Sequence, residues 1–233
     1  MRGTFYGVGV GPGNPELLTL EALQVLKSCP VLAVPETRKG TERALQVVKA
    51  ALDLSDKTLL PLEFVMERNP EHRQSSYEDS AEKVRNVLDS GRDVAMITLG
   101  DATLYSTVQY IQRLLEADGY STVLVPGISS VSASAARLNR SLTELDTEVH
   151  ILPAGADPDR LREALRLPGT KVLMKAGRQL PAVYEILKEE QLLEQTSLVA
   201  DCGLSTEHVI ANWAEEPDTD FGYFVTLIVK ETP

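Results

Sequence analysis

Short apolar runs alternate with longer segments of helical periodicity along the whole chain. The runs that predict strands are 4–10, 31–34, 94–99, 122–125, 148–152, 171–175, 197–201 and 223–229. The segments whose apolar residues recur at helical spacing are 17–27, 41–52, 75–89, 104–117, 129–136, 159–167 and 180–190. Strands that alternate with helices are typical of an α/β fold.

The run at 94–99 is apolar at nearly every position. Such a run suits a strand that is covered on both faces, as in a parallel sheet. A polar turn at Asp118-Gly119 separates two groups of these elements. We therefore expect two α/β domains with mostly parallel or mixed sheets, one formed by residues 1–118 and the other by residues 119–233.

Composition and charge narrow the class of protein. Hydrophobic residues make up 43% and charged residues 24% of the 233, as in a soluble globular protein. No apolar run reaches the roughly 18 residues of a membrane span, and the first residues lack the apolar core of a signal peptide. We therefore expect a cytoplasmic protein with no membrane partner. The net charge of −11 disfavours nucleic acid as a partner.

The two cysteines and three histidines do not form a metal-binding pattern. Cys29 and Cys202 lie far apart and belong to no C-x-x-C pair, and the histidines are scattered. Protein zinc sites need clustered ligands of these types. No metal site is expected.

A glycine-rich turn at 7–13 closes the first predicted strand. Glycine permits positive φ and lets a ligand approach the backbone. The dinucleotide pattern G-x-G-x-x-G fails here, because counting from Gly7 puts Pro12 at the third glycine and counting from Gly9 puts Asn14 there. Three interpretations stay open: a nucleotide site, a turn that contacts another ligand, and a purely structural turn.

Further turns follow other predicted strands, where ligands of α/β sheets collect. These turns are 99–105, 125–130, 172–178 and 201–204. Asp101 is suited either to accept hydrogen bonds from a ligand or to cap the following helix. Lys175 and Arg178 are suited to binding an anion, or are ordinary solvated residues.

Taken together, these residues resemble the tetrapyrrole (corrin and porphyrin) methylases. The shared pattern is Gly7-x-Gly9-x-Gly11-Pro12-Gly13-x-Pro15-x-Leu17-Leu18-Thr19, then Gly100-Asp101, then Val125-Pro126-Gly127-Ile128-Ser129-Ser130. The stretches 100–107, 173–178 and 223–229 are most similar to members that methylate C-20 of precorrin-2 or cobalt-factor II. The chain departs from the pattern at Ala102, where many relatives have proline, and at Asn14, where aspartate is usual.

The resemblance implies a homodimer of S-adenosylmethionine-dependent methyltransferase subunits that acts in cobalamin biosynthesis. In each subunit the methyl donor would lie in a cleft between the two domains. By position in the motifs, the residues expected to bind the donor are Pro12, Leu99, Gly100, Asp101, Thr103, Leu104, Ser129, Ser130, Ala176 and Gly203.

Methylation of a bridge carbon releases a proton, so a weak general base would assist. Asp101 and Tyr223 are the catalytic candidates, with Glu36 and water as further options. The tetrapyrrole carries several carboxylates, and cationic side chains would bind them. The residues expected to contact this substrate are Gly9, Gly11, Arg38, Arg68, Lys175 and Arg178.

Three other functions are compatible with parts of the pattern. The first is methylation of another tetrapyrrole, such as uroporphyrinogen III, or of a different target by the same fold. The second is a nicotinamide-dependent oxidoreductase, which only the glycine turn suggests. The third is a scaffold that binds tetrapyrrole without catalysis. The sequence does not distinguish a metal-free substrate from a cobalt-bearing one.

Overall fold

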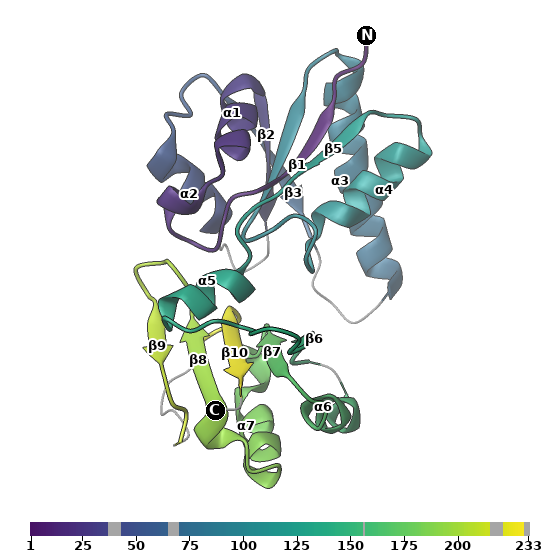
Figure 1. Ribbon diagram of the computed structural model, residues 1–233. Helices are drawn as coiled ribbons and strands as arrows, with labels where there is room; N and C mark the ends of the chain where they lie inside the picture. The colour runs from purple at the N-terminus through teal and green to yellow at the C-terminus, as the bar shows by residue number, and fades with distance from the viewer. Residues whose placement is uncertain (37–42, 65–69, 156, 215–220, 231–233) are drawn as a thin grey trace. The chain divides into compact units, whose positions relative to one another are not determined.

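The computed structural model describes residues 1–36, 43–64, 70–155, 157–214 and 221–230 (Figure 1). The chain divides into two compact units, residues 1–129 (unit 1) and 130–233 (unit 2). The boundary expected after residue 118 therefore lies too early. Strand β5 (Thr122–Val125) pairs in parallel with β1 (Phe5–Gly9), so it completes the first sheet and does not begin the second unit.

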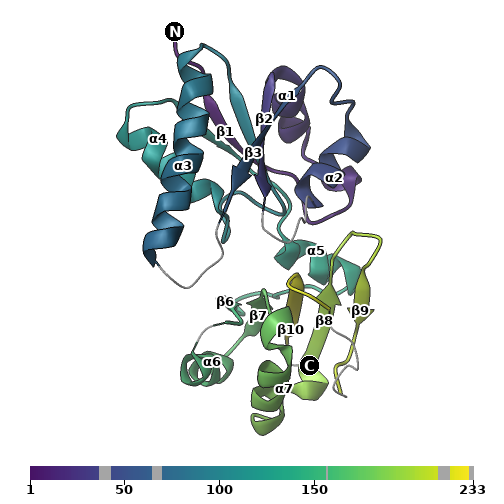
Figure 2. The same ribbon diagram turned by 180° about the vertical axis from the view of Figure 1, so that it is seen from behind.

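Unit 1 is built on a five-stranded sheet of order β3-β2-β4-β1-β5, in which every pair is parallel. Its other strands are β2 (Val31–Glu36), β3 (Thr58–Glu63) and β4 (Val94–Thr98). Its helices are η1 (Pro15–Leu17), α1 (Leu20–Ser28), α2 (Arg43–Ala51), α3 (Pro70–Asp89) and α4 (Val108–Ala117). Figures 1 and 2 show α1 and α2 on one face of this sheet and α3 and α4 on the other.

The strands of unit 1 bury side chains on both faces. In β2, Val31 and Ala33 pack in the core beside α3 and α4, whereas Leu32 and Val34 pack in the core beside α1 and α2. This alternation follows from the two-residue period of a strand. In β4, residues 94–97 are all fully buried. The prediction of a parallel sheet covered on both faces, made from the continuous apolar run, is confirmed.

Unit 2 contains a mixed sheet of order β6-β7-β10-β8-β9, in which only β6 and β7 are parallel. Its strands are β6 (Val149–Pro153), β7 (Thr170–Met174), β8 (Thr196–Ala200), β9 (His208–Ile210) and β10 (Val225–Val229). Its helices are α5 (Ser130–Arg137), α6 (Pro158–Leu165), η2 (Gly177–Gln179), α7 (Leu180–Glu189) and η3 (Leu193–Gln195).

Helices cover the sheet of unit 2 on both faces. Side chains of α6 and α7 share one core with β7, β8 and β10. On the opposite face Ala133 of α5 packs with Val199 and Cys202. With one parallel sheet and one mixed sheet, the two units confirm the predicted fold class. In the part of the chain that the structure describes, no helix is both long enough and apolar enough to cross a membrane.

Candidate functional site

In unit 1 three glycine-containing turns meet at the carboxyl ends of β1, β4 and β5. Gly11 and Gly100 exchange backbone hydrogen bonds, with N···O distances of 3.1 and 2.7 Å. A Cβ on Gly9 would lie 2.7 Å from the amide nitrogen of Gly127 and 2.8 Å from the carbonyl oxygen of Gly100. Only glycine allows the three backbones to approach this closely. Packing between turns is thus one physical reason for the glycine pattern.

The backbone at Gly100 also leaves room for a ligand. Its φ is +80°, and a Cβ built there would meet no atom within 4 Å. The same loop contains Tyr105, a non-glycine residue with φ of 52° and 42% exposure. Left-handed backbone at such residues is costly and concentrates at functional sites. The loop after β4 therefore combines an approachable backbone with a strained, exposed aromatic residue.

Asp101 ties two of these turns together. Its Oδ2 accepts a hydrogen bond of 2.8 Å from the Gly127 amide, and its Oδ1 accepts one of 2.7 Å from the Thr103 amide and another from the Thr103 hydroxyl. Partial burial alone would raise the pKa of Asp101, but the hydrogen bonds from Thr103 and Gly127 outweigh it and lower the pKa. The carboxylate is held as an anion whose two oxygens are both engaged.

Thr19 links the first turn to the turn after β5. Its hydroxyl accepts a hydrogen bond of 3.1 Å from the Ala22 amide at the start of α1, and it donates one of 3.3 Å to the carbonyl of Pro126. Thr19 belongs to the shared motif but was not among the predicted site residues, although a threonine directly before a helical segment is a capping signal. Asn14 caps η1 through a bond of 2.9 Å from the Glu16 amide. An aspartate at that position is therefore not needed for the cap.

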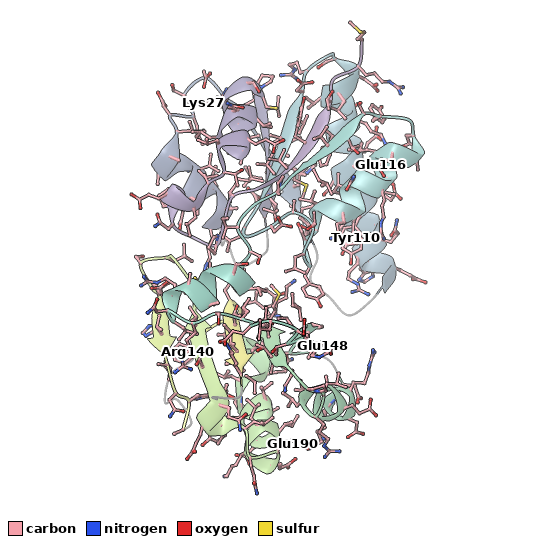
Figure 3. All side chains as sticks on the ribbon, viewed as in Figure 1. Lys27, Tyr110, Glu116, Arg140, Glu148 and Glu190 are labelled. Atoms are coloured by element: carbon pink, nitrogen blue, oxygen red, sulfur yellow. The ribbon has the colours of Figure 1, made fainter. Side chains whose placement is uncertain are left out.

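An aromatic stack flanks the same end of unit 1. The rings of Tyr77 in α3 and Tyr110 in α4 are parallel, with centroids 4.5 Å apart, and Phe64, directly after β3, lies 6.0 Å from Tyr77. Tyr110 is 46% exposed and occupies the first turn of its helix (Figure 3). The stack is not predictable from the sequence, because its members come from three separate parts of the chain and share no motif.

In unit 2 the turn after β7 holds Lys175, Ala176 and Arg178. Lys175 has φ of 60°, and Ala176 is fully buried. The Nζ of Lys175 lies 5.7 Å and the guanidinium carbon of Arg178 lies 5.4 Å from the ring centroid of Tyr223. Three of the predicted site residues therefore form one cluster of two cations on an aromatic ring.

The turn after β8 is fixed by an ion pair. The Gly203 amide donates to Glu207 Oε2 at 2.6 Å, and Arg137 Nε donates to Glu207 Oε1 at 2.8 Å. Partial burial alone would raise the pKa of Glu207, but the hydrogen bonds from Arg137 and the Gly203 amide lower it. Asp201, with φ of 48°, is buried in the same turn. The charged pair thus holds the predicted donor-binding residue Gly203 in place.

The predicted site residues fall into two groups. Unit 1 carries Gly9, Gly11, Pro12, Leu99, Gly100, Asp101, Thr103, Leu104 and Ser129, and unit 2 carries Ser130, Lys175, Ala176, Arg178, Gly203 and Tyr223. Ser130 is the first residue of α5, and its hydroxyl accepts a bond of 3.3 Å from Thr226. Pro12 is buried and Leu104 is half-buried. Arg38 and Arg68, predicted to contact substrate, lie outside the described residues.

The sequence profile of the tetrapyrrole (corrin/porphyrin) methylases matches residues 4–218. A probable cobalt-precorrin-2 C(20)-methyltransferase from Methanocaldococcus jannaschii is 43% identical over 156 residues, which are 66% of this chain and 66% of that protein. The precorrin-2 C(20)-methyltransferase of a Sinorhizobium species is 30% identical and covers 97% of this chain and 95% of its own length. The chain spans only 45% of a longer relative, cobalamin biosynthesis protein CobIJ of Mycobacterium tuberculosis, at 29% identity.

Among solved structures, the fold is similar to that of uroporphyrin-III C-methyl transferase from Thermus thermophilus complexed with S-adenyl homocysteine. The TM-score is 0.69 and the identity 24%, over 98% of each chain. At this identity the likeness establishes the fold, two α/β units of the same design.

Proposed function

Because the chain belongs to the tetrapyrrole (corrin/porphyrin) methylase family, we propose that it transfers a methyl group from S-adenosylmethionine to C-20 of precorrin-2 or its cobalt-bearing counterpart, in cobalamin biosynthesis. Membership confirms the family predicted from the motifs. The observation that carries the choice of C-20 is that relatives 43% and 30% identical to the chain are both named as methyltransferases of that carbon. Nothing in the family match favours the oxidoreductase or the scaffold.

The described residues fit a role in binding the methyl donor. The backbone of Gly100 borders open space, and Asp101 braces the turns around it. The relative from Thermus with this fold was solved with S-adenyl homocysteine. We assign the donor to Pro12, Leu99, Gly100, Asp101, Thr103, Leu104 and Ser129 of unit 1, and to Ser130, Ala176 and Gly203 of unit 2.

The main catalytic task of the protein in this reaction is to orient the methyl donor and the substrate. The sulfonium donor is already activated, so fixing the approach of the bridge carbon is the main contribution to the rate. A carbon–carbon bond forms at C-20 as the sulfur–methyl bond breaks, and a proton then leaves the methylated carbon. Asp101 is poorly placed to take this proton, because both its oxygens already accept hydrogen bonds from the turns, which also lower its pKa. We therefore propose that Asp101 positions the turns and that water accepts the proton.

The remaining features of the proposal concern assembly and location. We propose a cytoplasmic homodimer whose partners are small molecules, in line with the family resemblance. The excess of acidic over basic residues, 34 against 23, supports the absence of a nucleic-acid partner. Sedimentation equilibrium of the purified chain tests the dimer, and a mass equal to one chain would remove it.

The substrate is tested by offering the enzyme labelled S-adenosylmethionine with precorrin-2, cobalt-precorrin-2 and uroporphyrinogen III in parallel. Mass analysis of each product is expected to find one added methyl on a precorrin-2 form. Transfer to uroporphyrinogen III alone would favour the other methylase activity.

Donor binding is tested separately by calorimetry with S-adenosylhomocysteine. Ser130→Trp introduces bulk at a proposed donor residue, and Ser132→Trp, at an exposed serine of the same helix, is the matched control. We expect the first variant to lose affinity and the second to retain it. Equal affinities would remove Ser130 from the proposed site.

A further inference from the structure

Tyr223 lies at the centre of a charged cluster at one end of the sheet in unit 2. The cationic groups of Lys175 and Arg178 lie 5.7 and 5.4 Å from its ring centroid. Both distances fall within the roughly 6 Å over which a cation is attracted to an aromatic ring. Phe224 supports the ring edge-on, with centroids 5.2 Å apart and an interplanar angle of 83°.

Backbone contacts fix this cluster from several sides. The Ala176 amide donates to the carbonyl of Val225 at 3.1 Å, and the Asp201 amide donates to the carbonyl of Phe224 at 2.8 Å. Gly177 packs against the carbonyl oxygen of Gly222 so closely that a Cβ would collide with it. The segment that carries the ring and the segment that carries the cations are therefore held together by main-chain atoms. A site held in this way loses little entropy when a ligand binds.

The arrangement is costly to maintain in the absence of a ligand. Lys175 adopts a left-handed backbone, which costs a non-glycine residue about 1–2 kcal/mol. Arg178 forms no ion pair with any described residue. The protein as a whole is acidic, with a net charge of −11. Backbone strain at a residue whose cationic group lies on the same ring as a second cation indicates a function for the pair.

We infer that Tyr223 is a positioning residue whose ring holds the cationic groups of Lys175 and Arg178 at a binding site for a carboxylate of the substrate. Ammonium and guanidinium groups are the natural partners of carboxylates, and a paired site binds more tightly than either cation alone. That the carboxylate belongs to a tetrapyrrole rests on the proposed function. In this role the ring of Tyr223 matters and its hydroxyl does not, so Tyr223 is not the general base.

Steady-state kinetics on four variants separates these roles. Tyr223→Phe keeps the ring, Tyr223→Leu removes it, and Arg178→Ala removes one cation. Arg160→Ala removes an exposed arginine of α6 as the control. We expect Tyr223→Phe and Arg160→Ala to match the parent enzyme within about twofold. Tyr223→Leu and Arg178→Ala should raise the KM for the tetrapyrrole about tenfold, a change of about 1.4 kcal/mol, and leave the KM for the donor unchanged.

Two kinetic outcomes would overturn the inference. A large loss of kcat in Tyr223→Phe would make the hydroxyl a reacting group. An unchanged KM for the tetrapyrrole in Tyr223→Leu would show that the ring positions nothing. Thermal denaturation of each variant separates a failure to fold from a loss of binding.

A binding assay without turnover distinguishes failure of this inference from failure of the proposed function. Fluorescence titration with uroporphyrin III, a polycarboxylate, is compared with titration of its methyl ester. We expect the acid to bind the parent protein and Tyr223→Phe, and to bind Tyr223→Leu and Arg178→Ala about tenfold more weakly. This pattern supports the carboxylate site even if no precorrin-2 is methylated. Equal binding of acid and ester by the parent protein would overturn the site even if methylation occurs.

Discussion

The carboxylate oxygen Oδ2 of Asp101 accepts a hydrogen bond of 2.8 Å from the backbone amide of Gly127, which follows it by 26 residues. The bond joins the turn after β4 to the turn after β5, two strands that both pair with β1. The Gly-Asp and Pro-Gly motifs are therefore parts of one structural unit, and neither turn keeps its geometry independently of the other.

Replacing Asp101 by Asn should weaken both folding and donor binding. Asparagine keeps one acceptor oxygen, so the Gly127 amide or the Thr103 amide loses its partner, at a cost of about 1–2 kcal/mol. Urea denaturation measures the loss of stability, and calorimetry with S-adenosylhomocysteine is expected to show weaker binding. Asp53→Asn, at an exposed carboxylate that bonds only to its own turn, is the control. If both variants behave alike, Asp101 does not brace the site.

The contribution of Asp101 to the stability of the fold should decrease as the pH falls. Its pKa is lower in the folded protein than in the unfolded chain, so its stabilising effect is complete above the unfolded pKa and is lost as the pH falls through the folded one. The stability gap between the parent protein and Asp101→Asn should narrow between about pH 5 and pH 3. Denaturation curves across this range measure the gap. A gap that widens as the pH falls would contradict the assignment.

Gly9→Ala should be strongly destabilising. The added methyl group would lie 2.7–2.8 Å from backbone atoms of Gly127 and Gly100, which have no freedom to move aside. A loss of more than about 2 kcal/mol is expected in the free energy of unfolding. Gly155→Ala provides the comparison, because its φ, like that of Gly9, is not positive and a methyl group there would meet only the end of the Gln179 side chain, at 3.2 Å. This variant should lose little stability. Equal losses in the two variants would mean that close packing of the turns contributes nothing.

Glu207→Gln should loosen the turn that contains Gly203. The charged acceptor of the Gly203 amide is replaced by a neutral one, and the ion pair with Arg137 is removed. Hydrogen exchange of the Gly203 amide should accelerate about tenfold, the effect of losing roughly 1.4 kcal/mol of local stability. Glu185→Gln, at an exposed position of α7, should leave that amide unchanged. Unchanged exchange in Glu207→Gln would show that the turn is held by other contacts.

The two cysteines should be inert in the native protein. Burial, with a smaller effect from a nearby carboxylate, raises the pKa of Cys29 and of Cys202 to about 11. At pH 8 only roughly 0.1% of each thiol is then the reactive thiolate. A thiol reagent such as dithiobisnitrobenzoate should react slowly with the folded protein and rapidly, with two equivalents, in guanidinium chloride. Rapid reaction of the native protein would contradict this burial.

Helices and strands could be predicted from the sequence wherever burial alone determines the pattern of apolar and polar residues. Strand β4, whose residues 94–97 are fully buried, is predicted directly by its apolar run. Strand β3 was missed, because its residues are mostly exposed and include Pro61, which an edge strand tolerates. The short edge strand β9 was missed as well. The helix expected from residue 104 begins at Val108, because Tyr105 has a left-handed φ that a helix does not accommodate. The edge strands of a sheet and the ends of helices depend on tertiary contacts that a local sequence pattern does not encode.

The same limit applies to the site. The turns at the strand ends were predicted, because glycine and charged residues after an apolar run form a local signal. The bond from Gly127 to Asp101 and the two cations on the ring of Tyr223 join residues that are far apart in the chain. No periodicity links such pairs. The hydrogen bonds that engage both oxygens of Asp101 are likewise not encoded by any local pattern.

The most direct test of the account is the position of the transferred carbon. The enzyme is incubated with precorrin-2, with and without cobalt, and with S-adenosylmethionine labelled with ¹³C in the methyl group, and the product is analysed by ¹³C NMR. The account predicts a single enriched methyl group bonded to C-20. Enrichment at any other carbon, or none from an enzyme that still binds S-adenosylhomocysteine, would contradict it.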